Sequence, residues 1–313
     1  MRIGYPCINL TLKNNNPSTF RIKSYSDKRF NETVKNNLNH LQKILEFNVN
    51  NNILFFRLSS DIIPFASHPI CKVNWRNVFK KELKNIGDYI NNNKMRISMH
   101  PDQFVILNSK NERVIENSIR ELQYHSDLLE SMDMPFDAKI QIHIGGIYDN
   151  KSFAKERFIK IFTNLDENLK KRIVIENDDR LYTLKDCLEI NKQTEIPIIL
   201  DIFHHECLNN GENITDALVY AANTWEYSLD GFPIIDYSSQ SIGERKGKHT
   251  KTIYKNHFVY SYNQIKKIHK NYSIDFDIML EIKDKENSAF LALEIIKSLN
   301  NSNKKHLKQI SID

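Results

Sequence analysis

The stretch that decides the fold covers residues 172–202 and reads RIVIENDDRLYTLKDCLEINKQTEIPIILDI. Two apolar, β-branched runs, Arg172 to Glu176 and Pro197 to Ile202, lie on either side of a segment with helical periodicity. Unbroken hydrophobic runs of this kind are typical of parallel strands buried on both faces. Thr183 with Asp186 predicts a capping box at the start of the helix. The stretch is therefore a strand–helix–strand unit, and an acidic residue lies at the end of each strand.

The same alternation continues along the whole chain. Six further strands are predicted at Arg2 to Asn9, Ile53 to Leu58, Arg96 to His100, Lys139 to Ile144, Phe232 to Tyr237 and Asp277 to Ile282. Strands alternating with helices in this number indicate an α/β fold of the (β/α)8 (TIM) barrel type, and we expect residues 1–313 to form a single domain. An open doubly wound sheet is the alternative, but it gives no reason for ligand-type residues after every strand.

Segments between the strands carry apolar residues at helical spacing. The expected apolar faces consist of Val34, Leu38, Leu41 and Leu45; of Phe79, Leu83, Ile86 and Ile90; of Phe158, Ile161, Phe162, Leu165 and Leu169; and of Phe290, Leu293, Ile296 and Leu299. Ser152 is the expected N-cap of the third of these helices.

Composition limits the class of protein. Of the 313 residues 40% are hydrophobic and 27% charged, enough apolar material for one large core. The longest apolar runs have the length of strands and the first residues have no signal-peptide character, so we expect no membrane segment. The four cysteines form no CxxC pair, which fits a reducing, cytoplasmic compartment. A net charge of +5 permits nucleic-acid binding without establishing it.

Chemistry in a TIM barrel takes place at the carboxyl ends of the strands, where the loops converge. Residues able to bind metals occur there on successive strands, namely His100, His143, Glu176, Asp201, Asp236 and Glu281. Nearby loops add His68, His204 and His249. A capping or core role explains each of them taken singly, but chance does not produce the unbroken series.

Converging carboxylates and imidazoles require a cation, because unpaired carboxylates packed together repel one another and take up protons. Mixed nitrogen and oxygen ligation suits zinc or manganese, whereas magnesium prefers oxygen. These candidates exceed the needs of one ion, so two or three divalent ions are expected. Such sites favour phosphoryl chemistry, in which one ion activates a water and its neighbours neutralise the phosphate and the leaving oxygen. Glu176, at the centre of the series, and Glu281 are the expected catalytic residues.

A basic segment, residues 243–251, follows the seventh strand and reads GERKGKHTK. A run of charges is usually a solvated face. Here, however, Arg245, Lys246 and Lys248 lie next to the candidate ligand His249, at the rim of the expected cleft. Cations at such a rim can follow a phosphate backbone, so we predict that they bind DNA.

Seven blocks of sequence stand out in order along the chain. They are residues 4–12 (GYPCINLTL), 56–61 (FRLSSD, followed by Pro64 and His68), 98–103 (SMHPDQ), 142–146 (IHIGG), 174–178 (VIEND), 200–204 (LDIFH) and 280–283 (LEIK). Together they resemble the motifs of the UV damage endonuclease family, and the match covers nearly the whole chain.

The resemblance implies a barrel with a metal cluster, usually manganese, that cuts one strand of damaged double-stranded DNA immediately 5′ of UV photoproducts, with abasic sites as a common extra substrate. It implies metal ligation by His68, His100, His143, Glu176, Asp201, His204, His249 and Glu281. Tyr5, Asn9 and the pair Gln103–Phe104 would contact the DNA, where poorly stacked damaged bases cost less to extrude. The enzyme would act at the nucleoid, without a membrane or an obligate protein partner.

Three features depart from the family's pattern. The seventh strand has Ile234-Ile235-Asp236 where many members have Lys-x-His, and Asp236 stays a predicted ligand because aspartate binds hard cations. Phe104 replaces the tyrosine of the common Gln-Tyr pair, which keeps stacking and loses a hydroxyl. Thr250-Lys251 follow His249, where an acidic residue is common.

Two other functions remain open. Sugar isomerases and epimerases also gather Glu, Asp and His at the strand ends of a similar barrel, but they have no use for a basic rim. The second alternative is a protein that binds DNA lesions and has lost catalysis through the changes on the seventh strand. Metal content and nicking of irradiated plasmid separate the three functions.

Overall fold

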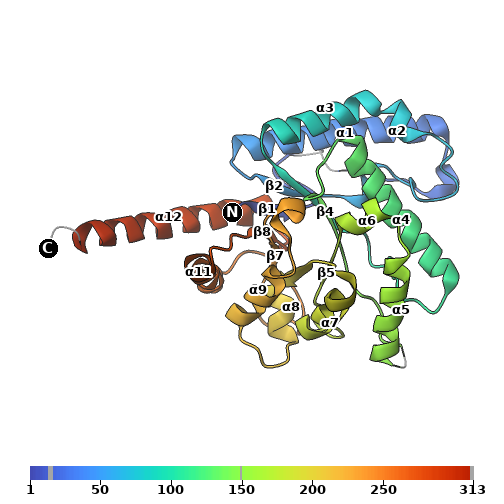
Figure 1. Ribbon diagram of the computed structural model, residues 1–313. Coiled ribbons are helices and arrows are strands. Elements are labelled where there is room, and N and C mark those ends of the chain that lie inside the picture. The colour runs from blue at the N-terminus through green and yellow to red at the C-terminus, as the bar shows by residue number, and fades with distance from the viewer. Residues whose placement is uncertain (13–16, 149, 311–313) are drawn as a thin grey trace.

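Eight parallel strands close into a barrel in which each strand pairs with its neighbours in the chain and the last pairs with the first (Figure 1). They are β1 Ile3–Pro6, β2 Phe55–Leu58, β3 Arg96–Met99, β4 Lys139–Ile142, β5 Ile173–Glu176, β6 Ile198–Asp201, β7 Ile234–Tyr237 and β8 Asp277–Leu280. The computed structural model describes residues 1–12, 17–148 and 150–310. The predicted (β/α)8 barrel is confirmed, and every strand lies within its predicted range.

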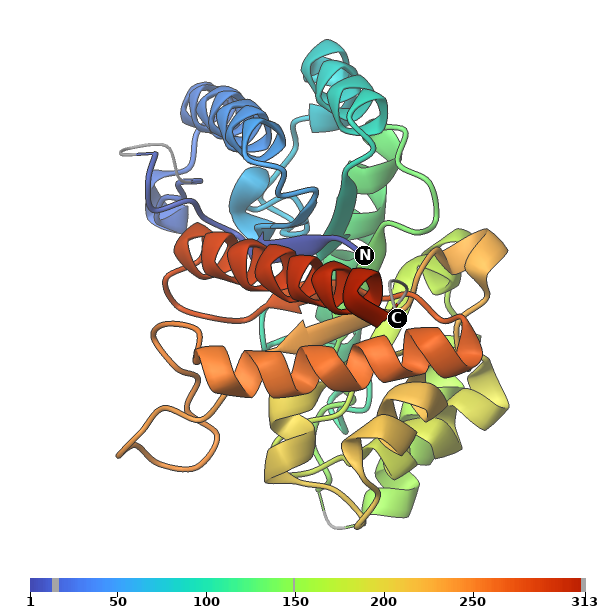
Figure 2. The same ribbon diagram turned by 90° about the vertical axis from the view of Figure 1, so that its left-hand side faces the viewer.

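Helices form the outer layer around the barrel (Figures 1 and 2). They are α1 Asp27–Asn50, α2 Trp75–Val78, α3 Lys80–Asn92, α4 Glu112–Ser131, α5 Lys151–Thr163, α6 Glu167–Arg172, α7 Leu184–Thr194, α8 Ile202–Cys207, α9 Ile214–Ala222, α10 Tyr227–Asp230, α11 Lys255–Tyr272 and α12 Glu286–Ile310, with 3-10 turns η1 Ile22–Ser24 and η2 Ser60–Ile62. Figure 2 shows α11 and α12 side by side on one flank. No helix in the described part of the chain is long and apolar enough to cross a membrane.

The capping box at Thr183 and Asp186 is confirmed, because each side chain accepts from the other residue's backbone N–H. The prediction of Ser152 as an N-cap is wrong. The cap is Asn150, whose side chain accepts a hydrogen bond from the Phe153 amide at 3.1 Å. Asn150 precedes the first helical residue and so can accept from this amide, whereas Ser152 already lies inside α5.

Three of the four expected apolar faces are buried against the barrel, and one of these three is divided between two helices. The series that starts at Phe158 is divided between α5 and α6, because Asp166 caps a new helix by accepting from the Asn168 and Leu169 amides. On α12 the apolar residues buried deepest are Ala289 and Ala292, one position before the expected Phe290 and Leu293, which are only partly buried. Small side chains let α12 pack closely against β1.

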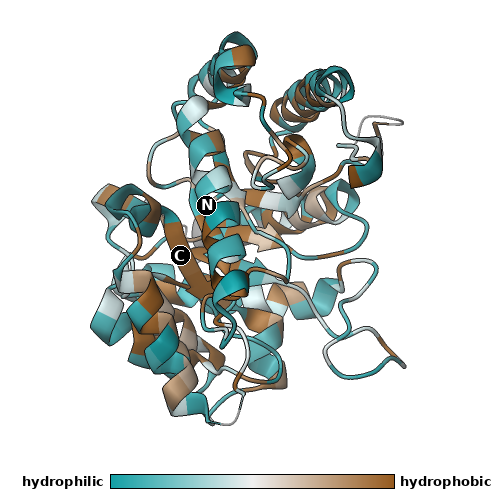
Figure 3. Cartoon of the chain, turned by 90° about the vertical axis from the view of Figure 1, so that its right-hand side faces the viewer, coloured by the Kyte–Doolittle hydropathy of each residue, from teal (hydrophilic) through white to brown (hydrophobic). Residues whose placement is uncertain are grey.

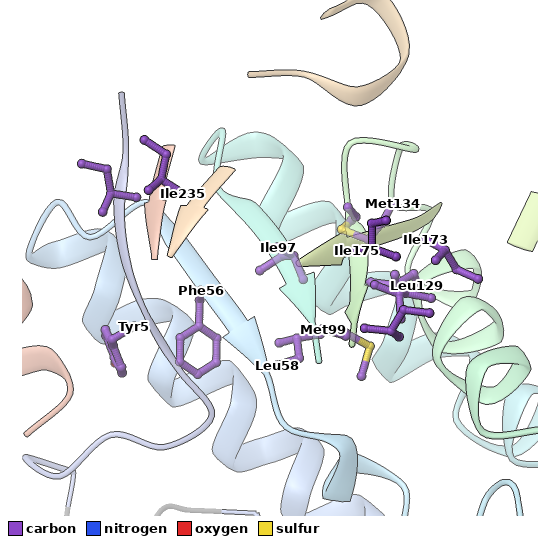
Figure 4. Packing of buried hydrophobic residues seen from close by; sticks show 14 of the residues in the cluster. Tyr5, Phe56, Leu58, Ile97, Met99, Leu129, Met134, Ile173, Ile175 and Ile235 are labelled. Atoms are coloured by element: carbon purple, nitrogen blue, oxygen red, sulfur yellow. The ribbon is translucent and has the colours of Figure 1, made fainter. Parts of the chain in front are cut away.

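Alternation along the strands separates two environments. One set of side chains points outward and forms the main apolar core between strands and helices, which Figure 4 shows around Tyr5, Phe56 and Ile97. Figure 3 shows hydrophobic strands, in brown, at the centre of the molecule and helices whose turns mix teal and brown around them. The other set points into the barrel, where Phe55, Val174, Ile199, Ile234 and Met279 form a separate buried cluster.

Charged residues lie in the barrel on both sides of this inner cluster. At the amino ends of the strands, Asp277 pairs with Arg96 at 3.0 Å and with Arg2 at 2.9 Å. At the carboxyl ends lie Arg57 and the acidic residues of the predicted site. The inner apolar cluster therefore separates an ion-paired floor from the chemically reactive mouth.

The floor gives a prediction about stability. Replacing Asp277 with Ala leaves the Arg96 guanidinium, whose side chain is 1% exposed, without its partner, and we expect a loss of about 3–5 kcal/mol in the free energy of unfolding. Asp275→Ala is the matched control, because Asp275 pairs with His269 at 3.1 Å on the surface and should cost about 1 kcal/mol or less. Urea denaturation of both variants measures the difference, and equal losses would contradict the role of the floor.

Candidate metal centre

The predicted metal-binding residues meet at the carboxyl ends of the strands. Glu176 and Asp201 are the last residues of β5 and β6, Asp236 lies on β7, and His100 and His143 directly follow β3 and β4. Three groups of side chains each bring their donor atoms within 4.8 Å of one another. The groups are His100, His143 and Glu176; Glu176, Asp201 and His204; and Asp201, Asp236 and Glu281.

Glu176 lies at the centre of the first group. Its Oε1 is 3.1 Å from His100 Nε2 and 3.0 Å from His143 Nε2. The carboxylate is almost fully buried, so it cannot be satisfied by bulk water. Glu176 and Asp201 are each shared between two groups, which makes the three groups one continuous cluster.

Backbone carbonyls orient three of the histidines. Nδ1 of His100 donates to Pro101 O at 3.0 Å, Nδ1 of His204 donates to Asn177 O at 3.0 Å, and Nδ1 of His249 donates to Glu281 O at 2.9 Å. A carbonyl only accepts, so each contact places a ring proton on Nδ1 and leaves Nε2 as the nitrogen that would face a cation once any proton on it is displaced. This is the arrangement found at metal-ligating histidines.

His68 differs from these residues. Its ring is exposed, lies outside the three groups, and its Nδ1 accepts a hydrogen bond from the Ile70 amide at 3.0 Å. That contact places the ring proton on Nε2, the opposite tautomer. His249 also lies outside the groups, but its ring centroid is 5.7 Å from that of His204.

Protons on the histidines supply the positive charge that compensates the buried carboxylates of this cluster. Burial opposes charge on Glu176, but His143 and His100 outweigh it and hold the pKa of this carboxyl well below its ordinary value. Burial likewise disfavours charged imidazoles, yet Glu176 raises the pKa of His143 to about 9, and Asp201 with Glu176 raises that of His204 to about 10. Burial raises the pKa of Asp201 to about 6. The ligands therefore share protons that a bound cation would displace.

Sequence reasoning missed two residues of the site, Arg57 and Gln141. Arg57 Nη2 donates to both oxygens of Asp236, at 2.9 Å each, and to Gln141 Oε1 at 2.7 Å. Gln141 Nε2 donates to Glu176 Oε2 at 2.6 Å and to Asp236 Oδ2 at 2.7 Å. Both were visible in the sequence as polar residues at inward positions of strands two and four.

Two of the predicted DNA contacts, Tyr5 and Asn9, are buried in this structure. Neither residue has exposed surface, and Tyr5 Oη donates to Asn48 Oδ1 at 2.7 Å while it accepts from Asn9 Nδ2 at 2.8 Å. They form a buried polar contact between β1 and α1, and their contacts with DNA stay predictions. Phe104, in contrast, is 52% exposed, and Gln103 beside it is exposed as well.

The basic loop projects from the barrel between β7 and α11 (Figure 2). An antiparallel bridge between Gln240 and His249 closes its base, so the loop holds His249 in place. Arg245 and Lys246 are exposed, whereas Lys248 Nζ pairs with Glu244 at 2.6 Å. Of the three cations predicted to bind DNA, Arg245 and Lys246 are therefore the more available to a partner.

Comparison with known proteins decides the family, because the model described as UV-endonuclease UvdE matches residues 1–311. The chain belongs to this family. The UV DNA damage endonuclease of Clostridium perfringens (strain 13 / Type A) is 40% identical over 301 residues, covering 96% of this chain and 72% of the relative. A putative UV-damage endonuclease of Acanthamoeba polyphaga mimivirus is 35% identical, covering 92% of this chain and 89% of its own.

Solved structures agree with the assignment of this UvdE family member. The crystal structure of SacUVDE matches with a TM-score of 0.89 and 45% identity, covering 96% of this chain and 99% of that one. A D-psicose 3-epimerase from Clostridium cellulolyticum H10 matches with a TM-score of 0.54 and 12% identity, over 84% of this chain and 92% of its own, and shares the fold alone. The resemblance drawn from the seven sequence blocks is confirmed.

The shared protons give a prediction about pH. His143 and His204, with pKa values of about 9 and 10, are protonated at neutral pH in the ion-free protein, so binding of Mn²⁺ must release protons. The apparent affinity should rise as pH rises from 6 toward 9, by about tenfold per unit for each proton released. Calorimetry at pH 7 in two buffers of different ionisation enthalpy counts the protons. His143→Gln should release fewer and His269→Gln, on the surface, the same number, whereas proton-free binding would contradict the prediction.

Proposed function

We propose that this member of the UvdE family is a metal-dependent DNA repair endonuclease that cuts the phosphodiester bond 5′ to UV photoproducts, with abasic sites as further substrates. The observation that carries the proposal is the Glu176 carboxylate, held between His100 and His143 at the mouth of the barrel. We further propose that it acts on double-stranded DNA inside the cell, at the nucleoid, without an obligate protein partner.

The donor set fits divalent cations. Asp201 Oδ2 is buried and has no hydrogen-bond partner, which is costly unless something else contacts it. The proposed ligands are His100, His143, Glu176, Asp201, His204 and His249. His68, Asp236 and Glu281 stay predicted ligands from the sequence. Two or three ions are proposed, manganese before zinc or magnesium, because the donors mix imidazole with carboxylate. When bound, such ions supply an activated water and neutralise charge on the phosphate and the leaving oxygen.

Neighbouring side chains hold the two proposed catalytic carboxylates in place. Glu176 and Glu281 are the proposed catalytic residues: Glu176 is held by two imidazoles and by Gln141, and Glu281 by Arg57, so neither carboxylate can turn away. Against the effect of burial, Arg57 lowers the pKa of Glu281 to about 2. Both groups therefore stay ionised, ready to hold a cation or to accept a proton at a carboxylate oxygen.

DNA recognition is proposed for the surface beside the site. A cavity of about 390 Å³ is lined by Phe104 together with Asp102, His68, Arg113 and Arg120. Its size lies within the usual range for small ligands, and an exposed aromatic ring with cations nearby suits a base that has left the stack. Gln103 and Phe104 would probe the lesion, and Arg245 and Lys246, with a smaller share from Lys248, would hold the phosphate backbone.

The alternative functions are weaker on specific grounds. A sugar epimerase explains the ligands but not the exposed Phe104 or the projecting basic loop, and the solved epimerase is only 12% identical. A lesion-binding protein without catalysis needs a damaged site, but Glu176 keeps both histidine contacts despite the changes on β7.

The incision activity is tested on an oligonucleotide that carries one defined photoproduct, with Mn²⁺ present. We expect a cut on the 5′ side of the lesion and none on undamaged DNA. Glu176→Gln keeps the shape but removes a charged oxygen, so incision should fall by about 100-fold or more while the melting temperature stays close to wild type. Glu167→Gln, on the exposed start of α6, is the control and should cut normally. Full activity of Glu176→Gln would exclude its catalytic role, and uncut lesions with a metal-loaded wild type would exclude the proposed function.

A second experiment separates a lesion probe from a structural residue. Because Phe104 is 52% exposed, Phe104→Ala should leave the stability nearly unchanged. It should weaken the preference for damaged over undamaged duplex by roughly 1–3 kcal/mol, the range for stacking of a base on an aromatic ring. Tyr272→Ala, at the far end of α11 and 58% exposed, is the control and should change neither quantity. An unchanged preference for damage in Phe104→Ala would rule the probe out.

A further inference from the structure

Arg57 supplies a fixed positive charge among the carboxylates at the mouth of the barrel. Its side chain is 3% exposed, and its guanidinium reaches both Asp236 on β7 and Glu281 after β8. These two carboxylates, with Asp201, make up the third of the candidate metal groups. That group has no histidine, and Arg57 contacts two of its three members.

The two aspartates of this group differ in what they can offer. Asp236 is fully buried, its oxygens each accept from Arg57 at 2.9 Å, and Oδ2 also accepts from Gln141 at 2.7 Å. All three contacts are with donors, so both oxygens of Asp236 are already engaged as acceptors. Asp201 Oδ2, in contrast, is buried and has no hydrogen-bond partner. Of the two aspartates, only Asp201 has an oxygen that accepts no hydrogen bond.

A divalent ion in the third group would compete with the guanidinium for the same oxygens. It would also be repelled by the buried positive charge, which cannot leave because arginine does not lose its proton in proteins. The two groups that contain histidine have no such competitor, since Arg57 contacts none of His100, His143 and His204 by hydrogen bond or ion pair in the described structure.

We infer that Arg57 is the resident cation of the third carboxylate group, so that Asp236 is its counter-ion instead of a metal ligand and the centre holds two metal ions, in the groups that contain histidine. Asp236 in turn fixes Arg57, and Arg57 Nη2 fixes the amide of Gln141 by donating to its Oε1. Gln141 must then present Nε2 to Glu176, at 2.6 Å from Oε2. Arg57 and Asp236 are therefore positioning residues that act on Glu176 through Gln141.

The test counts metal ions per chain and does not depend on activity. The full-length protein is stripped with a chelator, dialysed against Mn²⁺, and its bound manganese measured by elemental analysis for wild type, Asp201→Asn, Asp236→Asn and Arg57→Met. The two aspartate variants are a matched pair from one group. We expect two ions in wild type, two in Asp236→Asn, fewer in Asp201→Asn, and one additional ion in Arg57→Met, because the third group is then free of its cation.

The outcomes are distinct. Three ions in wild type, a loss of ions in Asp236→Asn equal to that in Asp201→Asn, or an unchanged count in folded Arg57→Met would each overturn the inference. If Arg57→Met does not fold, the wild-type count and the aspartate pair decide the question. The inference rests on the proposed metal dependence, and the same measurement tells the two apart: a wild type without bound metal overturns the proposed function and the inference together, whereas three ions overturn the inference alone.

Discussion

Burying Glu176, Asp201 and Asp236 inside the barrel creates an electrostatic requirement that the rest of the mouth has to satisfy. Three carboxylates with almost no exposed surface cannot all keep their charge unless positive charge lies within a few ångströms. The chain meets this requirement in two ways. Arg57 neutralises the side of the site near β7 and β8, and protons shared with histidines neutralise the side near β5 and β6. Only the second kind of neutralisation uses protons, which a bound cation would displace.

The layers inside the barrel keep the buried charges of the mouth apart from the other buried charges. The inner apolar cluster around Val174 and Met279 lies between the mouth and the ion-paired floor around Asp277. Each polar layer can therefore be satisfied on its own. The outward side chains of the same strands form the larger apolar core, so most of the apolar packing of the barrel lies outside the mouth. The buried carboxylates of the mouth are therefore available for chemistry.

Much of the fold and of the site could be predicted from the sequence, because buried parallel strands have a clear hydrophobic pattern. Apolar runs followed by polar residues gave the strands correctly, and the same residues at the strand ends, such as Glu176 and Asp201, meet in space. Caps were less secure, since Ser152 and Asn150 both precede Phe153 closely enough to suit the pattern and only the backbone geometry selects Asn150. The pattern also could not show that Tyr5, a polar aromatic at a strand end, points away from the barrel axis and donates its hydroxyl to Asn48 on α1.

The sequence did not show which side chain each charged residue of the mouth would contact. An arginine in FRLSSD and a glutamine in KIQI carry no sign of their contact, because their meeting depends on the register of strands far apart in the chain. The same limit applies to Asp236, a predicted ligand at a position where many family members have a histidine. In the sequence it is one more acidic residue at a strand end, while in space both of its oxygens already face Arg57. Aspartate can pair with a guanidinium through both oxygens and a neutral histidine cannot, so the residue on β7 and the arginine on β2 have to be considered as one unit. The chemistry of this mouth therefore depends on which carboxylates are left over once the protein's own cation has been satisfied.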